Sequence, residues 1–486
     1  MTEITIAAIV LPCFVGFIIY LFPKLDRSFS LGIGLISAGY AGLIFWQRSP
    51  LNIELLNNFG VILTVDRLSG FFILTNALVT IAVIVYSWRS DKTTFFYMQT
   101  LILHGSINSA FICADFISLY VALEVISIAA FLLIVYPRSD RLIWIGLRYL
   151  FVSNTSMLFY LIGTVQVYKI NHSFYYGGLA NAPPEAIALI FLGLLVKGGV
   201  FISGFWLPVT HSESQPQVSA MLSGIVVKAA VFPLLRCASL VEEIDPVVKL
   251  FGVGAAVLGV SFAVFEKDTK RTLAFSTISQ LGWILSSPVF GGFYALTHGL
   301  VKSTLFLIAG VLPSRNFQEL REQAIDTKIW IALVIASLSI CGFPLLPGFA
   351  AKMITLDDVS LWQAIALYIA TIGSVINFAK FIFIPHQISQ NRVKIELGFW
   401  WAMFILIGGL IAANGFYYLE TYSLNNILES LVKVAVGWLI YFLILRKFPL
   451  SLPRGMEKFE NLIGFMSPIL ILILGLVLWT RSHTLI

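Results

Sequence analysis

The chain has 486 residues, of which 58% are hydrophobic and only 12% are charged, and its formal net charge is +6. This composition leaves too little polar surface for a soluble domain, so a soluble fold is excluded. The basic residues follow the loops between apolar runs and form no basic stripe interleaved with aromatics, which excludes a nucleic-acid surface. We expect an all-α, polytopic integral membrane protein.

Apolar segments long enough to cross about 30 Å of hydrocarbon as helices recur along nearly the whole chain. They predict about 14–16 transmembrane helices. The candidate segments lie near residues 4–22, 29–46, 68–88, 94–113, 115–137, 141–168, 184–206, 215–240, 247–265, 270–288, 291–313, 328–355, 360–385, 396–416, 428–446 and 460–480.

Basic residues occupy alternate loops between these segments, which places those loops in the cytoplasm and both termini on the other side. The intervening loops are neutral or acidic. We expect a multi-pass protein of the plasma (inner) membrane or of a thylakoid membrane. The basic loop residues are Lys24, Arg27, Arg89, Lys92, Arg138, Arg141, Lys267, Lys270, Arg271, Arg315, Arg321, Arg392, Lys394, Arg446, Lys447 and Arg454.

Two segments carry helix-breaking residues in mid-span. Paired breaks of this kind are typical of transporter repeats, in which the break lines a wet or protein-enclosed cavity. We predict helices 1–3 in residues 1–93, a first five-helix repeat in 94–240, an inverted second repeat in 247–385, and C-terminal helices in 386–486. The breaking residues are Gly198, Gly199, Gly204 and Pro208 in the first break, and Gly342, Pro344, Pro347 and Gly348 in the second.

Ionisable residues recur inside the apolar spans, where a charge at the bilayer centre costs roughly 2.5–3.5 kcal/mol on insertion scales. Such residues must pair, become hydrated or exchange protons. The alternatives are a structural ion pair for Glu124, a satisfied core histidine for His298, and a side chain that reaches the interface for Lys352. His298 and Lys302 are four residues apart and share a helix face, which suits a proton relay. The predicted proton path consists of Glu124, Lys197, Lys228, His298, Lys302 and Lys352.

Three further residues have two open interpretations each. His211 and Glu213 follow the first break, where they either gate an entrance or are solvated loop groups. Lys380 lies near the cytoplasmic end of its span and is either a gating site or an anchor that reaches the interface.

No motif for a cofactor or a metal is found in the sequence. The four cysteines lie in or beside apolar helices without the spacing of a metal or haem site, and there is no glycine-rich nucleotide loop. We therefore expect no cofactor and no metal site in this chain.

Several strings resemble the antiporter-like family shared by Mrp-type multisubunit Na+/H+ antiporters and the large membrane subunits of respiratory complex I. The most specific is Asp-Thr-Lys-Arg-Thr-Leu-Ala-Phe-Ser-Thr-Ile-Ser-Gln-Leu-Gly at 268–282. The others are Val-Asp-Arg-Leu-Ser (65–69), Trp-Leu-Pro-Val-Thr-His-Ser-Glu (206–213), Val-Ser-Ala-Met-Leu-Ser-Gly (218–224), Thr-His-Gly-Leu-Val-Lys-Ser-Thr-Leu-Phe-Leu (297–307) and Gly-Phe-Ala-Ala-Lys (348–352).

The resemblance implies roles for the buried charges. Glu124 takes the place of the family's helix-five glutamate, Lys197 and Lys228 of its helix-seven and helix-eight lysines, and Lys352 of the ionisable residue after the helix-twelve break. His298 and Lys302 match the helix-eleven pair. In the family these residues form a hydrated axis, along which the glutamate and a lysine exchange partners as protons move.

Within the family, the chain is most similar to the D-type subunit of Mrp antiporters. Two departures are apparent: Ser-Gln-Pro-Gln replaces the usual Ala-Pro-Thr-Pro after His211 and Glu213, and two apolar spans follow the usual fourteen. We expect a proton-translocating subunit of a multisubunit cation/proton (Na+/H+) antiporter, with other membrane subunits, the lipid bilayer, protons and Na+ as partners. The alternatives are a proton-pumping subunit of an NAD(P)H- or ferredoxin-quinone oxidoreductase and a non-transporting assembly subunit.

Overall fold

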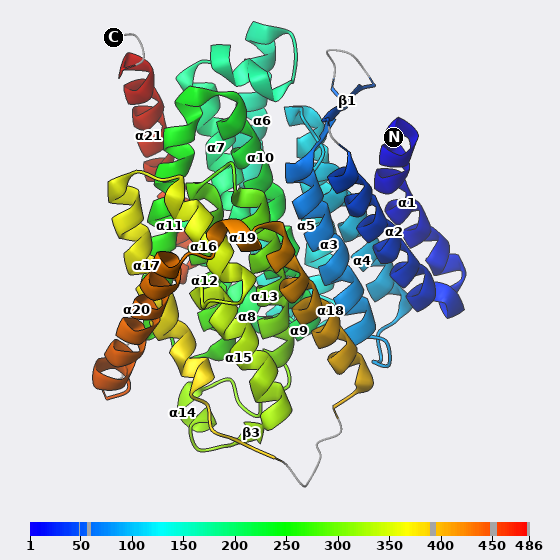
Figure 1. Ribbon diagram of the computed structural model, residues 1–486. Helices are drawn as coiled ribbons and strands as arrows, with labels where there is room; N and C mark the ends of the chain where they lie inside the picture. The colour runs from blue at the N-terminus through cyan, green and yellow to red at the C-terminus, as the bar shows by residue number, and fades with distance from the viewer. Residues whose placement is uncertain (48, 56–59, 389–394, 448–453, 484–486) are drawn as a thin grey trace.

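The protein is a bundle of long helices, as seen in a computed structural model that describes residues 1–47, 49–55, 60–388, 395–447 and 454–483 (Figure 1). Thirteen of the described helices are long and apolar enough to cross a membrane. Strands are confined, in the described residues, to two small two-stranded sheets. The predicted all-α, polytopic membrane fold is therefore confirmed. The predicted basic loop at Arg392 and Lys394 lies outside the described residues.

The elements of the first half run from the N-terminus to the end of the first interrupted region. They are α1 (Thr2–Leu21), α2 (Asp26–Trp46), β1 (Leu51–Glu54), β2 (Ile62–Val65), α3 (Arg67–Tyr86), α4 (Thr94–Ala110), α5 (Phe116–Ile134), α6 (Asp140–Asn171), α7 (Pro184–Gly198), α8 (Leu207–Glu213), α9 (Pro216–Met221) and α10 (Lys228–Leu240).

The second half continues with a further set of helices and one short parallel strand pair. They are α11 (Asp245–Phe265), α12 (Thr269–Ser286), α13 (Gly291–Ala309), α14 (Phe317–Leu320), β3 (Ile325–Asp326), α15 (Thr327–Cys341), α16 (Pro347–Asp357), α17 (Leu361–Ile382), β4 (His386–Gln387), α18 (Leu397–Ala413), α19 (Tyr418–Thr421), α20 (Leu424–Ile440) and α21 (Phe459–His483).

The remaining predicted spans correspond to helices that are shorter or more polar than the thirteen. They are α4, α12 and the consecutive helices α15 and α16. Every residue of α12 and α13 is buried. A helix that contacts protein on all sides does not need a lipid-compatible surface, which explains the many hydroxyl and amide side chains of α12.

Both chain ends lie at one end of the bundle, and α14 lies at the opposite end (Figure 1). Arg315 and Arg321 flank α14, so basic residues mark the end away from the termini. Lys270 and Arg271 belong to the first turn of α12 and not to a loop, which corrects the sequence interpretation. The assignment of the basic end to the cytoplasm stays a prediction.

Two spans are interrupted where glycine and proline predicted breaks. Gly199, with φ = +68°, caps the C-terminal end of α7, and a 3₁₀-helix (Phe201–Trp206) leads into α8. Gly342, with φ = +82°, caps the C-terminal end of α15, and α16 begins at Pro347. Glycine adopts positive φ without the steric penalty of a Cβ atom, and proline suits the first position of a helix. The inverted relation of the two five-helix units stays a prediction.

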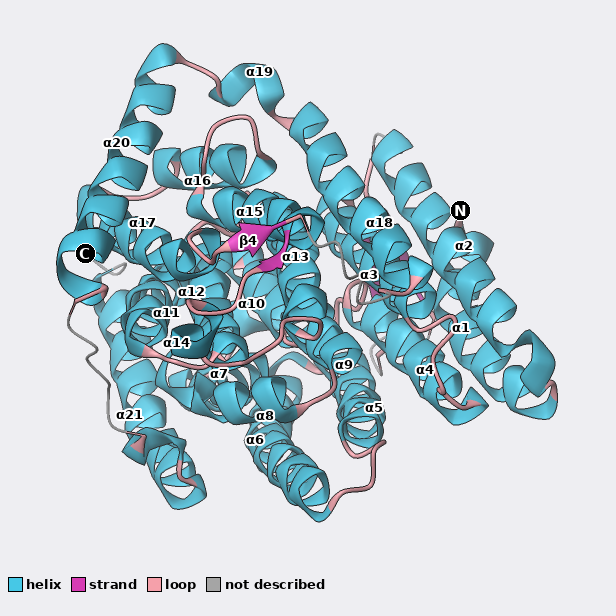
Figure 2. Cartoon of the chain, turned by 90° about the horizontal axis from the view of Figure 1, so that it is seen from below, coloured by secondary structure: helices cyan, strands magenta, loops and turns pink. Residues whose placement is uncertain are grey.

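The C-terminal helices pack on the outside of both halves, with α18 against α3 and α13. Figure 2 shows α18, α19 and α20 passing around α15, α16 and α17. α20 packs on α17, and α21 packs on α7.

Candidate functional site

Lys197 lies in the last turn of α7, directly before the first break, and its side chain reaches α5 and α6. Its Nζ donates to the carbonyl of Leu123 at 3.0 Å, to Ser153 Oγ at 2.5 Å and to Ser127 Oγ. The residue is 7% exposed. All its hydrogen-bond acceptors are therefore neutral oxygens.

Glu124 of α5 is half-buried, and it is adjacent in sequence to Leu123, whose carbonyl accepts from Lys197. Its Oε1 is buried without a hydrogen-bond partner, and no ion pair to Lys197 is present among the described residues. The two groups still interact electrostatically. The structure thus places Glu124 and Lys197 within electrostatic reach of each other without joining the two charges directly.

Lys228 is the first residue of α10 and follows a π-helical turn (Leu222–Val226). It is fully buried, and its Nζ donates to the carbonyls of Ser223, at 3.2 Å, and Gly224. A π-turn frees carbonyls from the regular i→i−4 pattern. The local backbone therefore supplies the acceptors for this ammonium group.

His298 and Lys302 lie on α13, and both interact electrostatically with Lys228. Lys302 is fully buried; its Nζ donates to the carbonyl of Leu273 at 2.9 Å and lies 5.4 Å from the ring centre of Phe378. The structure thus brings together Lys228, His298 and Lys302, as the sequence predicts for a relay.

A small enclosed cavity adjoins His298, whose two ring nitrogens are buried without hydrogen-bond partners. Its volume of about 10 Å³ suits roughly one water molecule. Several lining groups are polar, and Ser339 Oγ also lacks a partner. A water here would hydrogen-bond His298 next to the second break. The lining residues are Gln280, Tyr294, Thr297, His298, Val301, Ser339, Ile340 and Gly348.

Lys352 of α16 follows the second break and is 2% exposed. Its Nζ has no hydrogen-bond partner and lies 4.9 Å from the ring centre of Trp283. A cation–π contact stabilises an ammonium less completely than a set of hydrogen-bond acceptors does. This is the least satisfied of the buried lysines on the predicted path.

The two gating candidates after the first break have different environments. His211 is fully buried, and its ring centre lies 6.0 Å from that of Trp206 and 6.1 Å from that of Phe306. Glu213 forms ion pairs with Arg141 at 2.9 Å and with Arg315 at 3.5 Å. Glu213 therefore joins the first turn of α6 to the segment before α14, whereas His211 lies inside the bundle.

Lys380 donates to three carbonyls at the C-terminal end of α11, at 2.8 to 3.3 Å. The last carbonyls of a helix lack intrahelical partners and carry partial negative charge. This geometry favours the anchoring interpretation of Lys380 over a gating role. The acceptors are the carbonyls of Ala263, Val264 and Glu266.

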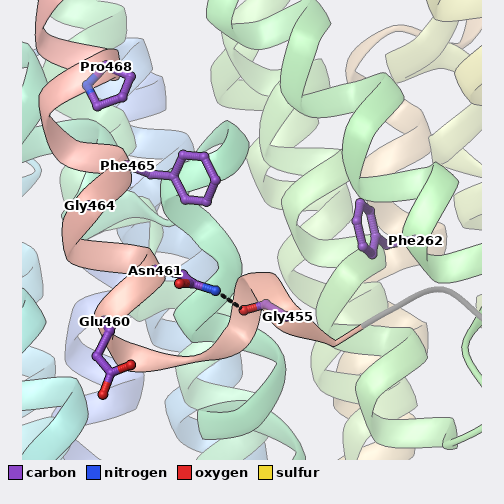
Figure 3. A pocket seen from close by; sticks show the side chains of 7 residues that line it. All are labelled: Phe262, Gly455, Glu460, Asn461, Gly464, Phe465 and Pro468. Atoms are coloured by element: carbon purple, nitrogen blue, oxygen red, sulfur yellow. Dashed lines mark hydrogen bonds between the residues drawn. The ribbon is translucent and has the colours of Figure 1, made fainter.

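A pocket of about 750 Å³ lies between α11 and α21, away from these lysines (Figure 3). Phe465 points toward Phe262 across it, and Asn461 hydrogen-bonds the carbonyl of Gly455 at its edge. None of the predicted site residues lines this pocket. This pocket is therefore separate from the predicted proton path.

Carboxylates at the helix ends outside the spans are paired with arginines. Burial raises the pKa of Asp66, but Arg236 and the backbone of Ser69 outweigh this effect, and the pKa lies below its usual value. The same opposition, with Arg271 as the dominant partner, holds the pKa of Glu266 below its usual value. These pairs fix helix ends and do not belong to the buried lysine series.

The family model described as "NADH:quinone oxidoreductase/Mrp antiporter, TM" matches residues 113–377, which is more than half of the chain. The chain belongs to this family. The matched range contains every residue of the predicted proton path and both helix breaks.

Individual relatives agree with the family assignment. The D-type subunit of the Na(+)/H(+) antiporter of Alkalihalophilus pseudofirmus is 27% identical over 394 residues, covering 72% of this chain and 80% of that protein. A chain of the Mrp complex from Dietzia sp. DQ12-45-1b superposes with a TM-score of 0.71 at 18% identity, covering 97% of this chain and all of that one. A chain of an archaeal respiratory complex, the membrane-bound sulfane sulfur reductase, gives 0.75 at 19% identity, covering 90% of this chain and all of that one.

The two structural matches show the fold alone. The Mrp complex chain aligns with nearly the whole length of this one. The sequence interpretation of the last two helices as an addition to the family's arrangement stays a prediction.

Sequence reasoning missed several residues next to the site. Ser127 and Ser153 hold Lys197, and only their hydroxyls in the middle of apolar helices could have indicated this. Lys270 is buried in α12 and donates to the carbonyl of Ser214 at 2.6 Å. Glu429 and Lys433 form an ion pair inside the span of α20, where two charges in an apolar run were a signal that was not used.

Proposed function

We propose that this chain is a proton-translocating membrane subunit of a multisubunit cation/proton (Na+/H+) antiporter, and that protons move along Glu124, Lys197, Lys228, His298, Lys302 and Lys352. The other subunits of a hetero-oligomeric membrane assembly are its partners. The family assignment and the relative from a Na(+)/H(+) antiporter support this proposal.

The main observation behind the proposal is that the lysines on the path are buried without a countercharge. Lys197, Lys228, Lys302 and Lys352 are each at most 7% exposed, and none takes part in an ion pair among the described residues. A permanent ammonium without a countercharge is costly in the interior of a membrane protein. A lysine with only neutral acceptors is able to lose and regain its proton at a smaller cost.

A second candidate function is a proton-pumping subunit of a redox complex. The family model spans NADH:quinone oxidoreductases, and the fold matches a chain of a respiratory complex with a TM-score of 0.75. The buried lysines would serve this function equally well. We propose that any redox groups would then belong to partner subunits.

The test measures proton flux in vesicles that contain the complete gene cluster. Lys197→Arg keeps a cation but removes the exchangeable proton, because a guanidinium stays protonated in proteins. We expect at least a tenfold loss of Na+- or K+-driven flux. Lys380→Arg is the matched control, since its guanidinium can still donate to the end of α11, and it retains flux.

Three outcomes separate the functions. Cation-driven flux that Lys197→Arg and Glu124→Gln abolish supports the antiporter. Flux that appears only with an electron donor moves the chain into a redox complex. Wild-type flux in both variants contradicts the proton path and favours a non-transporting assembly subunit.

A further inference from the structure

α20 carries a charged pair on a helix that otherwise suits a lipid environment. Its span covers Leu424–Leu445, and its outward face exposes Leu428, Val432 and Leu439. The residues on its buried face are Ser430, Lys433, Val434 and Gly437. Because these lie at i, i+3, i+4 and i+7, they form one stripe directed at the bundle.

Lys433 and Glu429 connect the interior of the bundle with its outer surface. Lys433 Nζ lies 2.8 Å from Glu429 Oε1 and 4.6 Å from the ring centre of Tyr368 on α17. The side chain of Lys433 is 9% exposed, whereas that of Glu429 is 41% exposed. Glu429 is also only five residues from the start of α20, which is about 8 Å along the helix. Water can reach the carboxylate more easily than the ammonium.

Two contacts hold α20, one at the second break and one against α17. Ser430 Oγ donates to the carbonyl of Gly342 at 2.6 Å. Gly437 lies so close to α17 that a Cβ atom there would meet Val375 Cγ1 at 2.6 Å. The charged pair is therefore held at a defined place beside the break.

Lys352 lies on the other side of the same glycine. A Cβ atom on Gly342 would meet Lys352 Cδ at 2.9 Å, while the carbonyl of Gly342 accepts from α20. Lys352 Nζ has no hydrogen-bond partner, and its charge and that of Lys433 repel each other. The two lysines are thus electrostatically coupled across the break.

We infer that Lys433 and Glu429 form the station at which protons pass between Lys352 and the outside of the bundle. This inference rests on the proposed function. A proton arriving at Lys352 raises the energy of the Lys433 ammonium, which transfers its proton to the carboxylate of Glu429. Glu429 releases that proton to water, and the neutral amine of Lys433 takes the proton from Lys352. One proton enters and one leaves, and the charges return to their initial state.

The experiment compares variants of the pair in vesicles carrying the complete gene cluster. Lys433→Arg preserves the ion pair but has no exchangeable proton. Glu429→Gln keeps an acceptor for Lys433 but binds no proton. We expect each variant to lose at least tenfold in cation-driven proton flux at normal membrane abundance, and the double variant to be no worse than either single one. Val432→Ala, on the outward face of α20, is the matched control with wild-type flux.

The outcomes distinguish a proton station from a structural pair and from a failed function. Wild-type flux in Lys433→Arg overturns the inference, because a purely structural ion pair tolerates arginine. If Lys433→Arg does not accumulate in the membrane, Glu429→Gln decides, and wild-type flux there overturns the inference. Lys197→Ala is measured in parallel. If Lys197→Ala loses flux while the Lys433 and Glu429 variants keep it, only this inference is rejected. If Lys197→Ala has wild-type flux, the proposed function is rejected.

Discussion

The two helix breaks have the same glycine geometry but different sources of support. At the first break, Trp206 Nε1 donates to the carbonyl of Val196 at 2.9 Å, and Ser203 Oγ donates to that of Leu195 at 3.1 Å. These donors follow the break within a few residues. At the first break, the donors to the Leu195 and Val196 carbonyls therefore come from the same interrupted span.

The second break depends on helices that come later in the chain. Ser430 donates to the carbonyl of Gly342, and Asn414 Nδ2 donates to that of Leu345 at 2.8 Å. Both donors lie beyond residue 377, where the family model ends. A broken membrane helix needs donors for its carbonyls, and at the second break Ser430 and Asn414 of the C-terminal region supply them.

The lysines beside the two breaks also differ in how well their ammonium groups are hydrogen-bonded. Lys197 has three oxygen acceptors from α5 and α6, whereas Lys352 has none and lies over Trp283. An ammonium at Lys197 is thus stabilised more strongly than one at Lys352. This asymmetry suits a path on which a proton rests near the first break and leaves near the second.

The largest effect is expected for an alanine substitution of one closely packed glycine at each break. A Cβ atom on Gly204 would overlap the carbonyl oxygen of Gly199, and one on Gly348 would overlap that of Ser339. Because backbone atoms cannot move aside cheaply, Gly204→Ala and Gly348→Ala should each lose most of their membrane abundance. Immunoblots of membrane fractions measure this. Gly408→Ala, whose Cβ meets no atom within 4 Å, is the control with normal abundance.

If only one of the two alanine variants accumulates normally, the breaks are not equivalent in packing. The shared close approach of the backbone would then not be a common requirement.

A smaller effect tests the dependence of the second break on α20. Ser430→Ala leaves the carbonyl of Gly342 without its donor, and an unsatisfied buried carbonyl costs about 1–3 kcal/mol. We expect a lower midpoint of heat-induced aggregation in detergent. Ser261→Ala is the control, since Ser261 bonds only the Val257 carbonyl of its own helix, at 2.8 Å. Equal midpoints for both variants would show that α20 is dispensable for this break.

The smallest effect concerns the paired carboxylates at the helix ends. The lowered pKa of Asp66 means that its pair with Arg236 stabilises the folded state fully above about pH 4, the usual range of an aspartate. As the pH falls further, Asp66 is protonated first in the unfolded state. The stabilisation is then lost as the pH falls to the lower pKa that Asp66 has in the folded state. The stability difference between wild type and Asp66→Asn should therefore shrink below about pH 4.

Glu242→Gln, which removes an exposed carboxylate without an ion pair among the described residues, is measured in parallel as the control. If the stability difference between wild type and Asp66→Asn does not change with pH, the ion pair does not contribute to stability.

The sequence by itself determined the spans, the two breaks and the buried lysines. Hydropathy sets which segments cross the membrane, because a helix satisfies its own backbone in lipid. Glycine and proline mark breaks such as those at Gly199 and Gly342, because their effect on the backbone is local. The existence of a lysine in an apolar run can be read without knowing its neighbours.

Only the tertiary structure decided which groups these lysines meet. Ser127 and Ser153 reach Lys197 from other helices, Lys380 caps the end of α11, and the charge of Lys433 acts on Lys352. Nothing in the order of residues fixes such contacts, because they depend on how distant helices pack and rotate against one another. The partners of a buried charge are long-range, whereas its burial is local, and this is why the sequence predicted where the charges lie but not what holds them.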